Sequence, residues 1–188
     1  TQLYDPFCGS GTILIEGALR ALNIPAGIGR GFAAEKWDAV PPHIWKEERA
    51  RGLDLVRKDA QFCAFGSDID RNAFELALDN ARKAGVAERV RVRIRDIKEF
   101  RVPETAAVVV TNPPYGERML DVEQARQIEK TMGRVFKRGL TGYYIISPDE
   151  EFEAQFGRRA NKIRRLYNGM LRCNFYMYYG DRPKKPAP

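Results

Sequence analysis

The sequence predicts an α/β fold with a mostly parallel sheet, because short apolar runs alternate with helical patterns along its 188 residues. The run AAVVVT at residues 106–111 lacks the polar alternation of a half-exposed strand, which indicates a central strand buried on both faces. Parallel sheets of this kind bind ligands beyond the carboxyl ends of their strands. The polar residues at the strand ends are therefore the candidates for a functional site.

The first half of the chain is predicted to form two strand–helix units separated by an insertion. We expect strands at residues 2–7 and 62–69, a helical segment at residues 10–22, and a Gly- and Pro-rich insertion over about residues 23–61 that carries a helix from about 42 to 58. The apolar residues of this inserted helix predict that it packs as a lid or brace: Ile44, Trp45, Leu53 and Val56.

Helix signals are clearest after the second strand. Asp70 is predicted to cap a helix that Gly85 ends. The apolar positions of this helix keep helical spacing: Ala73, Ala77, Ala81 and Ala84. Asp121 is predicted to cap a later helix, and one face of that helix is apolar: Val122, Ala125, Ile128, Met132, Val135 and Phe136.

The remaining strands complete one sheet. We expect them at residues 90–94, 106–111 and 142–147, followed by a short helix at 150–156 and a closing pair at 162–169 and 171–180. The chain is therefore predicted to hold one domain over residues 1–180, and its last segment, DRPKKPAP at 181–188, to be a flexible tail. Thr1 is not a methionine and a strand begins at once, so we expect the chain to be a piece of a longer protein.

Composition narrows the class of function. Lys and Arg total 32 against 25 acids, a formal charge of +7 that favours a polyanionic partner such as nucleic acid. The three cysteines are far apart and His43 is the single histidine, so we expect no metal site and no catalysis built on several histidines. Without a signal peptide or a run of eighteen apolar residues, we expect a cytoplasmic protein with reduced thiols and no membrane span.

The first candidate strand end is DPFCGSGT, residues 5–12. Gly9 and Gly11 allow the backbone to approach a ligand closely before the helix begins. Asp5, directly before this turn, would repel a dinucleotide pyrophosphate but suits a cationic sulfonium with an amino-acid ammonium. S-adenosylmethionine therefore fits the electrostatics better than NAD.

Two further strand ends carry acids. In GSDID, we assign helix capping to Asp70 and the ribose hydroxyls of a cofactor to Asp68. Asp68 comes much later than about 20 residues after the glycines, which also speaks against the nicotinamide fingerprint. In IRDI, Asp96 is a candidate acceptor for the exocyclic amine of an adenine.

The fourth strand end is NPPY, residues 112–115. Taken in order, DPFCGSGT, GSDID, RDI and NPPYGER resemble the class I S-adenosylmethionine-dependent methyltransferases, in which NPPY marks enzymes that methylate an exocyclic or amide nitrogen. With NIPAG and EKW in the insertion and the late KIRRLYNG and FYMYYG, the chain resembles the UPF0020 group over nearly its whole length. Members of that group are RNA guanine-N2 methyltransferases with an N-terminal THUMP RNA-binding domain.

The resemblance implies a Rossmann-like class I methyltransferase fold, with a seven-stranded mostly parallel sheet and helices on both faces. It implies that residues 1–180 are the catalytic domain and that the N-terminal RNA-binding domain lies outside this chain. The implied function is methylation of the N2 amine of a guanine in RNA, most similar to the enzyme that acts on large-subunit ribosomal RNA.

The resemblance also gives NPPY a chemical role. The lone pair of an exocyclic base amine is delocalised into the ring, so the amine is a poor nucleophile. The Asn112 side-chain oxygen and the Pro113 carbonyl can accept its two hydrogens and direct the lone pair toward the methyl group. Pro114 stiffens the turn, and Tyr115 offers a ring on which the base stacks.

These considerations predict a complete set of site residues. The catalytic residues are Asn112, Pro113, Pro114 and Tyr115. The residues predicted to bind S-adenosylmethionine are Asp5, Phe7, Cys8, Gly9, Gly11, Thr12, Asp68, Ile69, Asp96, Ile97 and Asn112. Those predicted to contact substrate RNA are Tyr115, Arg118, Lys162, Arg164, Arg165 and Asn168.

Four alternatives remain at the level of sequence. DNA adenine-N6 methyltransferases share the same four strand-end motifs, and a transfer RNA guanine-N2 methyltransferase would need no different residues. Enzymes that methylate glutamine in proteins also use NPPY, but the basic balance of this chain argues against a protein substrate. An intact NPPY and glycine turn argue against a domain that only binds RNA.

Overall fold

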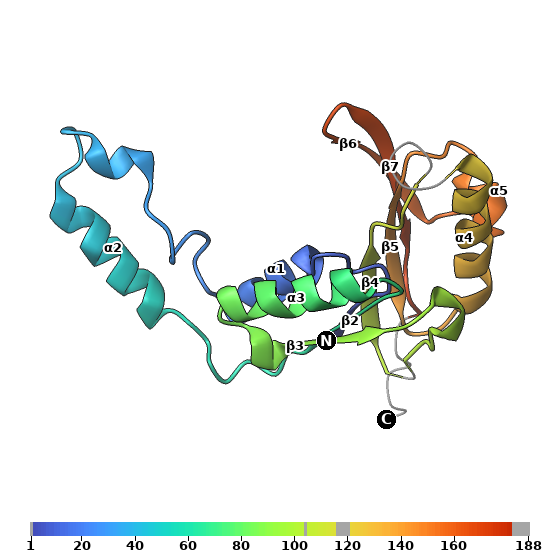
Figure 1. Cartoon of the computed structure of the whole chain (residues 1–188), viewed down its shortest axis with the longest axis horizontal. Helices are drawn as coiled ribbons and strands as arrows, with labels where there is room; N and C mark the ends of the chain where they lie inside the picture. The colour runs from blue at the N-terminus through green and yellow to red at the C-terminus, as the bar shows by residue number, and fades with distance from the viewer. Residues whose placement is uncertain (1, 104, 116–120, 182–188) are drawn as a thin grey trace, which may run out of the picture.

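The chain forms one seven-stranded sheet flanked by helices, seen in a computed structural model that describes residues 2–103, 105–115 and 121–181 (Figure 1). The strands lie in the order β3-β2-β1-β4-β5-β7-β6. Their bounds are β1 Gln2–Asp5, β2 Ala64–Asp68, β3 Val90–Ile94, β4 Ala107–Thr111, β5 Gly142–Ser147, β6 Lys162–Asn168 and β7 Leu171–Tyr178. The first five strands are parallel and β7 is antiparallel to both of its neighbours, so the predicted mostly parallel sheet is confirmed.

Helices cover both faces of the sheet, as predicted (Figure 1). Helices α1 (Thr12–Ala21) and α3 (Arg71–Lys83) lie on one face, and α4 (Val122–Val135) and α5 (Phe152–Phe156) on the other. Each face has its own apolar core. The core beneath α4 and α5 is built from stacked aromatic rings: Phe136, Tyr143, Phe152, Phe156 and Tyr176.

The predicted caps are confirmed. The carboxylate of Asp70 accepts a hydrogen bond from the Asn72 N–H at the start of α3, and that of Asp121 accepts one from the Gln124 N–H at the start of α4. The apolar stripe of α4 begins one turn later than predicted, because Val122, the first helical residue, is 61% exposed. Three 3-10 turns, Ala33–Lys36, Ala87–Arg89 and Ile97–Glu99, complete the helical elements of the described residues.

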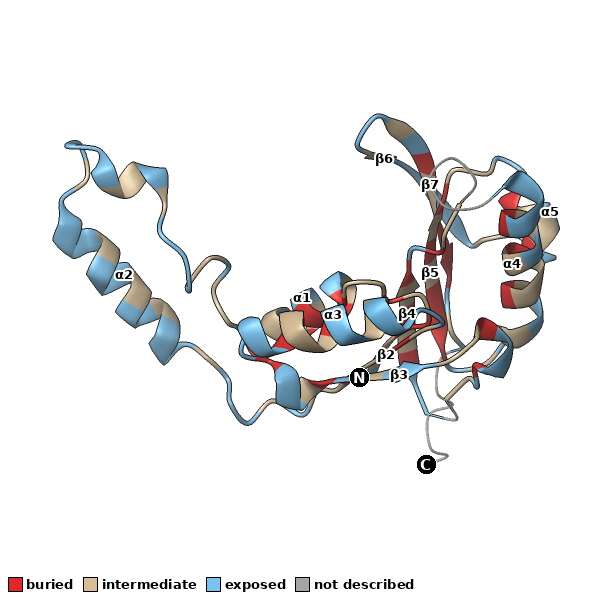
Figure 2. Ribbon diagram, in the orientation of Figure 1, coloured by how far each residue is buried: buried red, intermediate tan, exposed pale blue. Residues whose placement is uncertain are grey.

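The insertion between α1 and β2 forms an arm that extends away from the sheet (Figures 1 and 2). Its helix α2 (Pro42–Asp54) has no buried residue, and Ile44 and Leu53 are 40% and 56% exposed. The prediction that these two side chains pack as a brace is therefore wrong, because the arm does not lie against the core. Trp45 packs inside the arm instead, with its ring stacked on Phe32 at 5.9 Å between centroids.

The contact between α4 and α5 leaves no room for a side chain at Gly133. A Cβ built there would overlap the carbonyl oxygen of Phe156. We expect Gly133→Ala to lower the free energy of unfolding by roughly 1–3 kcal/mol, because overpacking this contact outweighs the better helix propensity of alanine. Urea denaturation measures the change. The control is Gly29→Ala in the arm, where an added Cβ meets nothing within 4 Å. Equal effects of the two changes would contradict this account of the packing.

Candidate functional site

A cavity of about 620 Å³ opens at the carboxyl ends of the parallel strands, where the strand order reverses between β1 and β4. This is the position at which open α/β sheets bind their ligands. Segments that follow β1, β2, β3 and β4 contribute to it, together with α4 and the end of β6. The lining residues are Pro6, Phe7, Gly9, Asp68, Ile69, Asp70, Arg95, Asp96, Ile97, Lys98, Asn112, Pro113, Pro114, Tyr115, Gln127, Ile128, Thr131 and Asn168.

The loop after β1 brings Pro6, Phe7 and Gly9 to the cavity. Gly9 and Gly11 have φ of +49° and +81°, a left-handed conformation that favours glycine. A Cβ on Gly11 would lie 3.1 Å from the Ala77 Cβ, so this glycine also lets the loop pack against α3. Gly9 lines the cavity, and a Cβ on it would meet nothing within 4 Å.

Asp68, at the end of β2, ties this loop to the start of α3. Its Oδ2 accepts a hydrogen bond from the Gly9 N–H at 2.9 Å, and its Oδ1 accepts one from the Asp70 N–H at 3.1 Å. A carboxylate has about four lone-pair sites, so acceptor capacity remains for a ligand. Ile69 follows with its side chain 70% exposed at the cavity.

The loop after β3 forms the next wall. The Asp96 Oδ1 accepts a hydrogen bond from the Lys98 N–H at 2.8 Å and so caps the 3-10 turn Ile97–Glu99. Ile97 is buried and still reaches the cavity lining. Two of the three carboxylates that line the cavity, Asp68 and Asp96, thus lie at neighbouring strand ends, with an isoleucine directly after each.

The turn after β4 forms the opposite wall. Asn112 is exposed at the cavity, Pro113 is buried, and Pro114 and Tyr115 are half-buried. The Tyr115 hydroxyl accepts a hydrogen bond of 2.7 Å from the Asn168 Nδ2 at the end of β6. A residue 53 positions away therefore holds the ring of Tyr115 in place.

A buried hydrogen bond connects the two sides of the site. The Thr111 Oγ1 donates to the Asp5 Oδ1 at 2.6 Å, and the Phe7 N–H donates to the same oxygen at 3.1 Å. Asp5 is 1% exposed, and its burial raises the pKa of its carboxyl to about 7, although both hydrogen bonds lower it. Asp5 thus joins the end of β1, the loop after it and the end of β4.

The structure brings most of the predicted site residues to this cavity and leaves others behind its wall. Four residues predicted to bind the cofactor are not in the lining: Asp5, Cys8, Gly11 and Thr12. Lys162, Arg164 and Arg165 lie exposed on β6, outside the lining but on the strand that ends at Asn168. Arg118 lies outside the described residues, as does the predicted tail from residue 182 onward.

Sequence reasoning missed part of the lining. Arg95 and Lys98 flank the predicted Asp96 and Ile97, so proximity to Asp96 was the available signal. Gln127, Ile128 and Thr131 come from α4, where helical periodicity predicted only a core-facing role for Ile128. In the described residues, we find neither a group of His, Cys, Asp or Glu side chains suited to a metal ion nor a helix long and apolar enough to cross a membrane.

Comparison with known proteins assigns the chain to a family. Residues 1–177 match the family model UPF0020, described as an RMKL-like methyltransferase domain. The putative RNA methyltransferase YpsC of Bacillus subtilis (strain 168) is 36% identical over 183 residues, which cover 96% of this chain and 48% of YpsC. Ribosomal RNA large subunit methyltransferase K/L of Shewanella baltica (strain OS185) is 36% identical over 198 residues, which cover all of this chain and 28% of that protein.

A solved structure has the same fold and similar sequence. The crystal structure of SMU.472, a putative methyltransferase complexed with SAH, superimposes with a TM-score of 0.93 and 36% identity. The match covers 98% of this chain and 49% of SMU.472. The chain therefore spans about half the length of YpsC and of SMU.472.

The raised pKa of Asp5 has a consequence for stability. The folded state favours the protonated carboxyl, so this group stabilises the fold at low pH, and the contribution is lost as pH rises from about 4 to about 7. We expect Asp5→Asn, which keeps an acceptor for Thr111 and Phe7, to be more stable than wild type at pH 8 by about 1–4 kcal/mol. The gain should disappear toward pH 4. Urea unfolding at a series of pH values measures the difference.

Asp79→Asn is the control. Its carboxyl is exposed on α3, and the hydrogen bond from Lys83 lowers its pKa, so the sign of its effect at pH 8 should be reversed. A pH-independent difference between Asp5→Asn and wild type would show that Asp5 does not titrate as its burial requires.

Proposed function

We propose that this chain, which belongs to the UPF0020 family of RMKL-like methyltransferase domains, methylates the exocyclic N2 amine of a guanine in large-subunit ribosomal RNA with S-adenosylmethionine as the methyl donor. One observation carries the proposal. Asn112 and Tyr115 stand on one side of a cavity whose other side holds Asp68 and Asp96. A base amine and a methyl donor can therefore meet across it.

The cavity suits S-adenosylmethionine in size and charge. Its volume of about 620 Å³ lies in the usual range of small-molecule sites. The lining has three carboxylates against two cations, so it favours a cationic ligand over a pyrophosphate: Asp68, Asp70 and Asp96 against Arg95 and Lys98. This excess of acidic over basic side chains in the lining agrees with the SAH that is named in the SMU.472 complex. When bound, S-adenosylmethionine supplies a methyl group activated by a positively charged sulfur.

Some of the residues predicted to bind the cofactor contact it, and others only position the residues that do. Asp68 accepts from ribose hydroxyls, and Ile69 and Ile97 offer apolar surfaces to a planar base. Gly9 leaves room for the ligand where any other residue would place a Cβ. Asp5, Cys8, Gly11 and Thr12 act from behind the wall, where they position the loop that carries Phe7 and Gly9.

The NPPY turn acts on the target amine. The Asn112 side-chain oxygen and the Pro113 carbonyl accept its two hydrogens, which turns the nitrogen lone pair toward the methyl group. Tyr115 stacks on the base, a contact worth about 1–3 kcal/mol in other proteins. Because Asn168 fixes the Tyr115 hydroxyl, the ring is already oriented before the substrate arrives. Alignment of this kind lowers the activation free energy of methyl transfer by several kcal/mol, so the proposed reaction needs neither a metal nor a histidine.

RNA is the favoured substrate for three reasons. The chain carries a net charge of +7. Lys162, Arg164 and Arg165 lie exposed on the strand that ends at the cavity. The relatives YpsC and methyltransferase K/L are named as RNA methyltransferases, and the second as one of the large ribosomal subunit. These names and charges support a ribosomal RNA substrate over DNA, while the choice of guanine N2 rests on the resemblance to the UPF0020 group, since NPPY also occurs in adenine-N6 methyltransferases.

Mass spectrometry of nucleosides tests the proposed function. Large-subunit ribosomal RNA from a strain that lacks the gene should gain N2-methylguanosine when incubated with the full-length protein and S-adenosylmethionine. Transfer RNA from the same strain and unmodified DNA are the parallel substrates. If the product is N6-methyladenine in DNA, or N2-methylguanosine in transfer RNA alone, the substrate is DNA or transfer RNA and the proposal of a ribosomal RNA substrate is wrong.

Asn112 separates chemistry from cofactor binding. We expect Asn112→Ala to lower the single-turnover rate constant by about 100- to 1,000-fold, or about 2.7–4 kcal/mol, by analogy with loss of one oxyanion-hole donor. Affinity for S-adenosylhomocysteine, measured by calorimetry, should fall far less than the rate constant, because Asp68 and Asp96 hold the cofactor from the other side and Asn112 is one of several predicted contacts. Asn72→Ala, at an exposed asparagine of α3 outside the lining, is the control. Near-normal turnover of Asn112→Ala would mean that another group holds the amine.

A further inference from the structure

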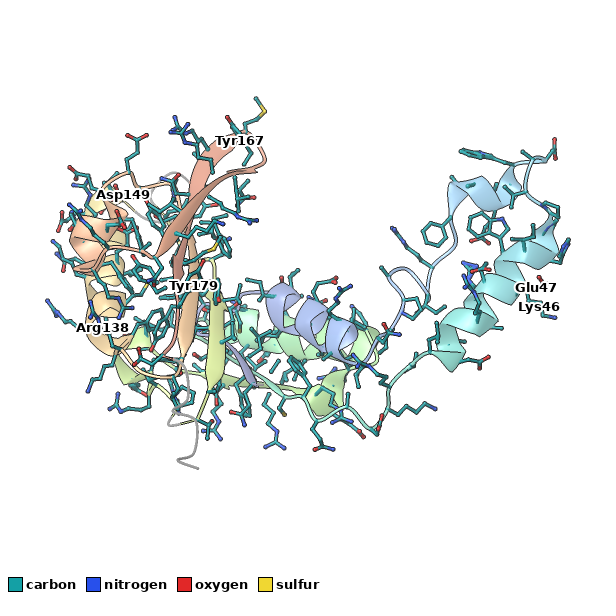
Figure 3. The ribbon with its side chains drawn as sticks, turned by 180° about the vertical axis from the view of Figure 1, so that it is seen from behind. Lys46, Glu47, Arg138, Asp149, Tyr167 and Tyr179 are labelled. Carbon is teal, nitrogen blue, oxygen red and sulfur yellow. The ribbon has the colours of Figure 1, made fainter. Side chains whose placement is uncertain are left out.

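The hairpin of β6 and β7 projects beyond the rest of the sheet on the side where the cavity opens (Figures 1 and 3). Its strands pair from Lys162 with Met177 to Asn168 with Leu171, which leaves Gly169 and Met170 as a two-residue turn. Gly169 has a φ of +64°, the value needed when glycine is the first central residue of such a turn. The hairpin therefore ends in a narrow tip at Met170.

A hydrogen bond fixes this tip beside the catalytic turn. Asn168, the last residue of β6, lines the cavity and donates to the Tyr115 hydroxyl at 2.7 Å. Met170 follows two residues later, so its Cα lies at most about 7 Å from that of Asn168. Nucleotides in a helix are spaced about 3.4 Å apart along one strand, so the tip lies within about two base steps of Asn168, which anchors the Tyr115 ring.

The tip exposes apolar side chains. Met170 is 98% exposed, Tyr167 74% and Leu166 39%, and Figure 3 shows Tyr167 at the projecting end of the hairpin. Single exposed apolar residues are common on protein surfaces. Here Met170 lies in the turn, and Tyr167 and Leu166 lie on opposite faces of the strand before it, beside the mouth of the site, so the tip gains free energy when a partner covers it on both sides.

The strands behind the tip are cationic. Residues 162–178 include Lys162, Arg164, Arg165 and Arg172 and no Asp or Glu. Within the described part of the chain, none of these four forms an ion pair. Arg164 points to one face of the hairpin, whereas Arg165 and Arg172 share the other, because side chains alternate along a strand and Arg172 pairs with Tyr167. Cations on both faces suit a polyanion whose phosphates pass on either side of the tip.

We propose that this hairpin is a wedge that opens the RNA helix at the target nucleotide. Met170 enters the gap that the guanine leaves when it turns into the cavity, Tyr167 stacks on a neighbouring base, and the flanking cations hold the phosphates. Apolar side chains, methionine among them, occupy unstacked base steps in this way in other nucleic-acid complexes. The wedge rests on the proposed function, because a base in a helix must leave its stack to reach the Asn112 amide.

Two RNAs distinguish a wedge from a simple contact. Both carry the guanine that the wild-type, full-length protein methylates in large-subunit ribosomal RNA, either paired in a stem or unpaired in a loop. We expect Met170→Ala to lower kcat/KM about tenfold or more on the paired guanine and less than about twofold on the unpaired one, since only the paired base needs a wedge. Met170→Leu should restore most of the activity. Leu76→Ala, at an apolar residue of α3 that is 49% exposed, is the matched control.

Fluorescence reports the same step without turnover. With 2-aminopurine placed beside the paired guanine, binding of wild-type protein should raise the emission as the base unstacks, and Met170→Ala should reduce that rise. Equal loss of kcat/KM on both RNAs, or no loss on either, would overturn the wedge while leaving guanine methylation intact. If wild-type protein methylates guanine in neither RNA, the proposed function fails and the wedge fails with it.

Discussion

The hydrogen bond from Thr111 to Asp5 is the constraint on which the site depends, because it crosses the point where the strand order reverses. Asp5 ends β1 and Thr111 ends β4, the residue directly before Asn112. The same carboxyl oxygen accepts the Phe7 N–H and so holds the loop that reaches the ligand. One buried side chain therefore sets the distance between the two walls of the cavity across which we propose that donor and acceptor meet. Its burial raises the pKa of the carboxyl, a cost that a purely structural aspartate on the surface would not have.

Asp68 repeats this arrangement one strand further out. It holds the Gly9 N–H with one oxygen and the Asp70 N–H with the other. Asp5 is closed off from the cavity, whereas Asp68 lines it, so only Asp68 has free acceptor capacity facing a ligand. The two acids at the ends of β1 and β2 thus differ in role: the buried Asp5 only holds neighbouring segments together, whereas Asp68, which lines the cavity, can also bind a ligand. Sequence pattern alone assigned both to the cofactor, since it cannot tell which carboxyl lies behind the wall.

Features that depend on local signals could be predicted from the sequence. The caps at Asp70 and Asp121 follow from a few neighbouring residues. The prediction that β4 is buried on both faces is wrong in part, because Ala107, Val109 and Thr111 are buried whereas Val108 and Val110 on the other face are only half-buried. The convergence of Asp68, Asp96 and Asn112 followed from the rule that parallel strands share their carboxyl edge. Features that depend on how a segment is oriented relative to the sheet, or on contacts between residues far apart in the sequence, could not be predicted. The apolar residues of α2 suggested that it packs as a lid or brace, but no local signal indicates that Leu53 lies exposed on an arm that extends away from the sheet. The bond between Asn168 and Tyr115 joins residues 53 positions apart and has no local signal.

The order of strands leaves β3 and β6 as the two outer strands of the sheet, each with one edge that no other strand of the described chain covers. Uncovered edges invite pairing with a second chain, which leads to aggregation. Both outer strands carry exposed cations: Arg91 and Arg93 on β3, and Lys162, Arg164 and Arg165 on β6. Like charges oppose the approach of an identical edge, and this protection lasts only while the cations face water. A polyanion that neutralises β6 would also remove its protection, so the cations that we propose bind RNA also keep the free protein from joining edge to edge.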